Sequence, residues 1–100
     1  MRVKIIMTWN IKPGKEQAYF GFVISEFMPR ASRLGMELTD AWATVYGDQP
    51  QILAGARMPD LDRARKLVNS KAWLQLIQEL EEFVNDFKLK LVTPKGNFQF

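Results

Sequence analysis

The sequence predicts an α+β fold in which two helices cover one face of a single antiparallel sheet. Strand-like alternation of apolar and polar residues occupies four stretches, 2–12, 37–46, 51–58 and 87–93. A long helical pattern follows the first stretch, a second helical pattern precedes the last, and a Gly-Asp-Gln-Pro turn joins the middle two. The resulting βαββαβ order is that of a ferredoxin-like sandwich.

The first strand shows the alternation most clearly. Its odd-numbered residues from Val3 to Ile11 are all apolar, so we expect this side of the strand to face the helices. Pro13 has no amide hydrogen to donate and Gly14 permits a turn, so the strand ends there. A helix is then predicted from about residue 15 to residue 34.

Apolar residues recur along this first helix at spacings of three and four and predict its buried stripe: Phe20, Val23, Phe27, Ala31 and Leu34. Pro29 lies inside the run and cannot donate a hydrogen bond to the Ser25 carbonyl. We therefore expect a kink or a break near residues 26–28.

The two middle strands form a predicted hairpin, with apolar residues on both of its faces. Gly55, in the middle of the third strand, indicates a bulge or a close neighbouring backbone. Asp60 is expected to cap a short helix that follows, and Ser70 to cap the second main helix, which runs from Lys71 to about Asn85. Apolar residues predict the buried stripe of that helix: Trp73, Ile77, Leu80, Val84 and Phe87.

Composition restricts the class of protein. With 47% hydrophobic residues, the 100-residue chain is expected to fold as one domain, residues 1–100. The lack of cysteine excludes disulfides and thiolate metal sites and favours a reducing cytoplasm. The lack of histidine excludes Ser-His and Cys-His dyads and most transition-metal sites. We therefore expect neither a metal nor a cofactor.

Two further kinds of partner are not expected. RNA-recognition modules share this strand order but stack bases on aromatic residues of the first and third strands. The third strand here has no aromatic residue, which predicts no nucleic-acid partner. No segment approaches the roughly 20 apolar residues that a bilayer span requires, which predicts no membrane partner.

Polar residues embedded in the apolar strands are the candidates for a binding site. Asn10, Asp40 and Arg57 could line a cavity and bind a carbonyl, phenol or carboxylate, with Arg57 as a bidentate donor. In the alternative interpretation, Arg57 pairs with Asp40 or Glu37 within the sheet or across a dimer. The three tryptophans are interpreted as packing residues rather than as a ligand cage.

Four segments together resemble the dimeric α+β barrel superfamily: Lys12-Pro13-Gly14-Lys15-Glu16, Leu34-Gly35, the Trp42-centred second strand and Ser70-Lys71-Ala72-Trp73. Within it, the chain is most similar to NIPSNAP-like and antibiotic-biosynthesis-monooxygenase-like domains. The resemblance implies a homodimer with its two sheets face to face, and a small-molecule pocket between each sheet and its helices. Some members are cofactor-independent oxygenases or haem-degrading enzymes that use a first-strand asparagine and a later tryptophan, for which Asn10 and Trp73 are the nearest matches. The haem-degrading members also need a histidine ligand, which this chain lacks.

A homodimer is also expected from the residues themselves. Helices on one side of the sheet leave Ile6, Thr8 and Asn10 of the first strand uncovered, together with one face of the hairpin and part of the last strand. Exposing apolar area forfeits about 25 cal/mol per Å², and large exposed apolar patches usually mark an interface. A two-fold partner would cover this face with its own copy.

We thus expect a small-molecule-binding homodimer, with a cofactor-independent monooxygenase-like reaction on an aromatic or polyketide-like compound as its candidate activity. Asn10 is the candidate catalytic residue, which would polarise a carbonyl, and the substrate-binding candidates are Tyr19, Trp42, Arg57 and Trp73. The alternative is a non-catalytic interaction or assembly module. A cavity of a few hundred Å³ with Arg57 or Asn10 in its wall would favour the first hypothesis, and a filled core would favour the second.

Overall fold

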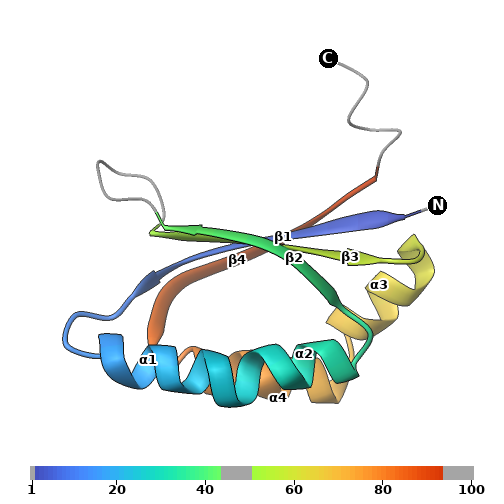
Figure 1. Cartoon of the computed structure of the whole chain (residues 1–100). Coiled ribbons are helices and arrows are strands. Elements are labelled where there is room, and N and C mark those ends of the chain that lie inside the picture. The colour runs from blue at the N-terminus through green and yellow to red at the C-terminus, as the bar shows by residue number, and fades with distance from the viewer. Residues whose placement is uncertain (1, 44–50, 94–100) are drawn as a thin grey trace.

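The computed structural model describes residues 2–43 and 51–93, which form one antiparallel sheet with helices on one side of it (Figure 1). The strands are β1 (Val3–Ile11), β2 (Glu37–Ala43), β3 (Ile52–Met58) and β4 (Val84–Val92), in the spatial order β2-β3-β1-β4. The helices are α1 (Glu16–Phe22), the π-helical turn η1 (Val23–Phe27), α2 (Met28–Arg33), α3 (Leu61–Val68) and α4 (Lys71–Leu80). The predicted ferredoxin-like α+β fold is confirmed. The predicted hairpin turn at residues 47–50 and the strand end at 44–46 lie outside the described residues.

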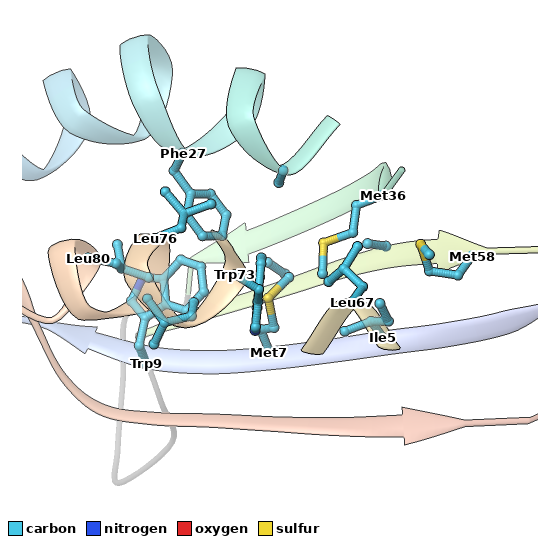
Figure 2. Close-up of a cluster of buried hydrophobic side chains, with 14 of the residues drawn as sticks. Ile5, Met7, Trp9, Phe27, Met36, Met58, Leu67, Trp73, Leu76 and Leu80 are labelled. Atoms are coloured by element: carbon cyan, nitrogen blue, oxygen red, sulfur yellow. The ribbon is translucent and has the colours of Figure 1, made fainter. Parts of the chain in front are cut away.

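The core lies between the helices and the sheet. The central strand β1 pairs with β3 on one side and β4 on the other. Its odd-numbered residues Val3, Ile5, Met7 and Trp9 are each at most 2% exposed, so the predicted helix-facing side is confirmed. Figure 2 shows Trp9 near Phe27, Leu76 and Leu80, and Ile5 near Leu67.

A π-helical turn shifts the register of the first helix. Met28 N–H donates to the Val23 carbonyl, an i to i−5 bond, just before Pro29 removes the next donor. The chain stays helical through this turn, so the irregularity that Pro29 predicts is a π-helical turn and not a break in the helix. The extra residue that it inserts moves the buried face upstream by one position: Tyr19 is 3% exposed, whereas Phe20 is 54% exposed. The prediction that Phe20 is buried is therefore wrong, because it assumed an uninterrupted 3.6-residue period.

The second main helix is shorter than predicted. It ends at Leu80 instead of Asn85, and two residues of its predicted stripe, Val84 and Phe87, belong to β4. Asp86 has a φ of +58°, and the pairing of β4 with β1 shifts in register at this point. This bulge interrupts the alternation of apolar and polar residues, so the sequence predicts only the part of the strand that follows Asp86.

Both predicted helix caps are present. The Asp60 carboxylate accepts a hydrogen bond from the Arg63 amide at 2.8 Å, and the Ser70 hydroxyl accepts one from the Trp73 amide at 3.2 Å. The bulge that Gly55 predicts lies in the neighbouring strand. Leu38 pairs with Ala56 and Asp40 pairs with Gly55, so Thr39 is the extra residue in β2.

The opposite face of the sheet carries no element among the described residues (Figure 1). Side chains of three strands alternate onto it: Lys4, Ile6, Thr8, Leu53, Arg57, Lys88, Lys90 and Val92. Four of these side chains are cationic, and they come from three strands. We call this surface the open face. No helix among the described residues is long and apolar enough to cross a membrane.

Candidate ligand-binding site

A cavity of about 300 Å³ lies between the first helix and the sheet, at the side of the edge strand β2. Its lining comes from β1, α1, η1, α2, β2 and β3: Trp9, Tyr19, Val23, Phe27, Met28, Leu38, Thr39, Ala41, Ile52 and Ala54. This volume is at the lower end of the range that small-molecule sites occupy. Hollows of 390 Å³ beside α3 and 480 Å³ on the open face are larger, but no aromatic side chain lines either of them. We refer to the space beside Tyr19 as the cavity.

Two irregularities of the backbone meet at the cavity. The π-helical turn η1 contributes Val23 and Phe27 to its wall. The β2 bulge contributes Thr39, and it also allows Leu38 and Ala41 to line the same wall, although residues three apart in a regular strand point to opposite faces. Such irregularities are frequent at functional sites. Their convergence makes this cavity the strongest candidate for a binding site.

Two aromatic side chains supply the polar feature of the wall. The Trp9 indole N–H donates to the Tyr19 hydroxyl oxygen at 2.8 Å, and the two residues are 2% and 3% exposed. Burial raises the pKa of Tyr19 above its usual 10.0, which the hydrogen bond from Trp9 partly offsets. The Tyr19 hydroxyl therefore keeps its proton at neutral pH.

Two aromatic rings contact Trp9 from the core, and a third supports one of them. Phe87 of β4 stacks on Trp9 with ring centroids 5.9 Å apart, and Phe27 of η1 meets it edge to face at 5.9 Å. Trp73 of α4 packs behind Phe27 at 6.0 Å. Edge-to-face and offset-stacked pairs are the favoured aromatic geometries. The cavity wall at Trp9 and Phe27 is thus rigidly supported from the core.

The structure separates the residues that the sequence singles out as candidates. Tyr19 lines the cavity. Trp73 is 2% exposed and packs in the core without lining the cavity. The backbone of Trp42 lies in β2 opposite Leu53, and its side chain lies outside the described part of the structure, as does that of Asp40.

Asn10, near the end of the central strand β1, is held by hydrogen bonds within the protein. Its side-chain oxygen accepts from the Gln51 amide at 2.8 Å, and its side-chain nitrogen donates to the Asp86 carboxylate at 3.2 Å. Gln51 in turn accepts from the Ile11 amide at 2.6 Å. These contacts join the ends of β1, β3 and β4. Asn10 therefore has a structural role, and it is not part of the cavity wall.

Arg57 lies on the open face. Its guanidinium meets Glu37 of the neighbouring strand at 2.7 Å, in direct register. This is one of the two intra-sheet partners that the alternative interpretation names. The Arg57 Nε is buried and has no hydrogen-bond partner among the described residues. Arg57 therefore lies on the opposite side of the sheet from the cavity.

Tyr19 is the only one of the ten lining residues that the sequence singles out as a site candidate, and the other nine are missed. Trp9 and Phe27 share the spacing of the buried core, so periodicity assigns them to packing. Pro29 is the one local signal, because it predicts the irregular turn that shapes the wall. Among the described residues, no group of three or more metal-ligating side chains could hold a metal ion.

Several solved structures have the same fold. A NIPSNAP family protein from Agrobacterium tumefaciens strain C58 is 23% identical, with a TM-score of 0.68 over 94% of this chain and 93% of its own. An uncharacterised NIPSNAP-like domain protein from Burkholderia xenovorans is 13% identical, with a TM-score of 0.66 over 93% of this chain and 84% of its own. An ethyl tert-butyl ether D family protein from Bacillus halodurans C-125 is 13% identical, with a TM-score of 0.69 over 93% of this chain and 98% of its own.

The chain thus has the α+β fold of NIPSNAP-like domains, over nearly its whole length. The resemblance that the sequence suggests is confirmed at the level of the fold. No model of a protein family matches the sequence, and no curated protein matches it significantly.

Proposed function

We propose that this domain binds a small, largely apolar molecule in the cavity. The observation that carries the proposal is the convergence of a π-helical turn and a β-bulge on an aromatic-lined cavity of about 300 Å³ that opens beside β2. A purely structural assembly module would instead fill this place with side chains. The cavity therefore favours ligand binding over the assembly role that the sequence leaves open.

A cavity-filling variant tests this function. Ala54 is 8% exposed and lines the cavity, so Ala54→Leu adds bulk where the ligand would lie. Ala72→Leu makes the same change at an exposed position of α4 and is the matched control. Acetophenone and ethylbenzene are suitable probes, followed by chemical-shift changes in ¹H–¹⁵N spectra. We expect Ala54→Leu to abolish binding and Ala72→Leu to retain it. Binding of neither probe to the native chain would contradict the proposal.

A monooxygenase-like reaction is the activity that this cavity could host. The aromatic wall formed by Trp9 and Phe27 suits an aromatic or polyketide-like substrate, and the Tyr19 hydroxyl could polarise its carbonyl. Oxygen uptake with a hydroquinone-type substrate, compared between the native chain and Ala54→Leu, tests this activity. Equal uptake by both would place any turnover outside the cavity.

The second partner that we propose is another copy of the chain, on the open face. Ile6, Leu53 and Gly55 lie together at its centre, in paired positions of β1 and β3. Water would otherwise contact this apolar area. A second copy would cover this area with its own open face. Lys88 and Lys90 must then lie at the rim or meet acidic groups of the partner, because like charges that face each other repel.

Light scattering measures this assembly directly. We expect a dimer at micromolar concentration, and Leu53→Lys should yield a monomer by placing a charge at the centre of the face. Leu74→Lys is the matched control, because Leu74 is 55% exposed on α4, on the helical side of the molecule. A monomeric native chain would contradict the homodimer.

A further inference from the structure

We infer that the cavity selects an uncharged ligand with a hydrogen-bond acceptor such as a carbonyl or ether oxygen, and that the Tyr19 hydroxyl donates to it. This inference rests on the proposed binding function and adds the chemical class of the ligand.

The hydrogen atom of the Tyr19 hydroxyl is available. The indole of Trp9 has only a donor, so in their 2.8 Å contact the Tyr19 oxygen must accept. That bond occupies a lone pair and leaves the hydroxyl hydrogen to be donated elsewhere. Among the described residues, the structure shows no acceptor for it. Tyr19 is 3% exposed, so the donor is also largely removed from bulk water.

A buried donor without a partner is costly, and a ligand acceptor removes that cost. The bond from Trp9 also polarises the Tyr19 hydroxyl, because hydrogen bonds in a chain strengthen one another. Trp9 therefore acts twice: it fixes the position of the Tyr19 oxygen, and it makes the hydroxyl a better donor. A ligand that accepts this hydrogen bond completes a Trp9–Tyr19–ligand chain.

The rest of the lining disfavours a charged ligand. Of its ten residues, eight are apolar or indole side chains and the other two, Tyr19 and Thr39, are neutral hydroxyls. A carboxylate or ammonium group would lose its hydration here without gaining a counter-ion, which is strongly unfavourable. The preferred ligand is therefore neutral, apolar over most of its surface, and polar at one atom.

The opening of the cavity lies beside the edge strand β2. Met28 lines the cavity and is 46% exposed, and Thr39 at the bulge is also exposed. Tyr19 and Trp9 lie at its buried end, since both are at most 3% exposed. We therefore expect the ligand to enter past Met28 with its acceptor atom foremost.

Three probes of similar size separate these contributions. Acetophenone has a neutral acceptor, ethylbenzene has none, and benzoate is charged. We expect acetophenone to bind most tightly and benzoate not to bind. Tyr19→Phe should weaken the binding of acetophenone about three- to tenfold, which is the contribution of one neutral hydrogen bond. It should leave the binding of ethylbenzene unchanged. Unchanged ethylbenzene binding also shows that the variant keeps its cavity.

The outcomes are distinct. If both neutral probes bind and Tyr19→Phe leaves acetophenone unaffected, the donor role of Tyr19 is wrong while the binding function stands. If benzoate binds as tightly as acetophenone, the selection for neutral ligands is wrong. If neither neutral probe binds the native chain, the binding function itself fails, and the inference fails with it.

Discussion

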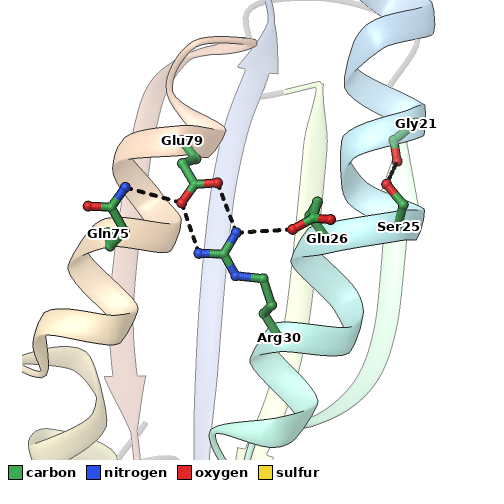
Figure 3. Close-up of polar contacts among 6 residues, drawn as sticks. All are labelled: Gly21, Ser25, Glu26, Arg30, Gln75 and Glu79. Atoms are coloured by element: carbon green, nitrogen blue, oxygen red, sulfur yellow. Dashed lines mark hydrogen bonds and ion pairs between the residues drawn. The ribbon is translucent and has the colours of Figure 1, made fainter.

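Arg30 of α2 and Glu79 of α4 form a bidentate ion pair that joins the two helical segments covering the sheet (Figure 3). The two N–O distances are 2.8 and 2.9 Å. Glu26, one turn before Arg30, contacts the same guanidinium at 3.3 Å, and Gln75 donates to Glu79 at 3.2 Å. The pair bridges α2 to α4, and Glu26 of the π-helical turn η1 joins it through the same guanidinium.

This ion pair makes the stability of the domain depend on acidic pH. Hydrogen bonds from Arg30, and then from Gln75, lower the pKa of Glu79 from 4.5 to about 2. Between these two values the unfolded chain binds the proton and the folded chain does not. The contribution of Glu79 is therefore present above pH 4.5 and is lost as the pH falls towards 2.

We expect Glu79→Gln to be less stable than the native chain at neutral pH and to approach it in acid. Urea unfolding at a series of pH values measures this difference. Glu81→Gln is the control, because Glu81 is exposed just beyond the end of α4. A stability difference that stays constant from neutral pH to pH 2 would contradict the assignment.

Tyr19 makes the stability of the domain depend on alkaline pH, with the opposite sign. Burial raises its pKa above 10.0, so the folded chain keeps the proton after the unfolded chain has lost it. Stability due to this group is present below about pH 10 and falls as the pH rises towards the folded pKa. Tyr19→Phe should lose this alkaline decline.

The same tyrosine reports on its contact with Trp9. The Trp9 hydrogen bond lowers the pKa of Tyr19, so Trp9→Phe should raise that pKa further. Ultraviolet titration of tyrosinate measures it, in a Tyr46→Phe background that leaves Tyr19 as the one tyrosine. Titration of Tyr19 at or below pH 10 in the native chain would show that it is not buried as described.

Local patterns in the sequence predict those parts of the fold that depend on interactions between residues close together in the chain. The alternation of β1 and the caps at Asp60 and Ser70 are correct, because each depends on neighbours within a few residues. The burial of Tyr19 in place of Phe20 could not be predicted, because the π-helical turn adds a residue without changing the apolar pattern. The start of β4 could not be predicted either, because the bulge at Asp86 interrupts the alternation of apolar and polar residues.

The site was less accessible to sequence reasoning than the fold. Asn10 and Arg57 are predicted site residues because they are polar side chains within apolar strands. Both make contacts within the sheet and lie away from the cavity. The cavity is almost wholly apolar, and an apolar residue that lines a cavity has the same spacing as one that fills a core. Tyr19 was identifiable because it is the one polar aromatic residue on the first helix.

Two glycines should respond oppositely to the same substitution. Gly35 follows α2 with a φ of +105°, a conformation that favours glycine, whereas Gly21 lies within α1 with no atom within 4 Å of an added Cβ. We expect Gly35→Ala to destabilise the domain by about 1–3 kcal/mol through backbone strain. Gly21→Ala should stabilise it by about 0.5–1 kcal/mol through helix propensity. Thermal unfolding of both variants measures the difference, and equal effects would contradict the backbone assignment at Gly35.

Two phenylalanines in the first helical segment test the register of the π-helical turn. Phe27 is 2% exposed and contacts both Trp9 and Trp73, so Phe27→Ala should cost about 3–5 kcal/mol of stability and enlarge the cavity. Phe20 is 54% exposed and contacts Tyr19 edge to face at 5.2 Å. Phe20→Ala should therefore cost about 1 kcal/mol or less.

An uninterrupted helix would bury both rings and make the two losses similar in denaturant unfolding. The enlarged cavity adds a second measurement, because apolar cavities of this kind bind small aromatic molecules. Ethylbenzene should raise the unfolding midpoint of Phe27→Ala more than that of Phe20→Ala, since a ligand that binds only the folded state stabilises it. If Phe20→Ala is the more damaging change, Phe20 and not Tyr19 faces the core, and the wall of the cavity has been assigned to the wrong side of the helix.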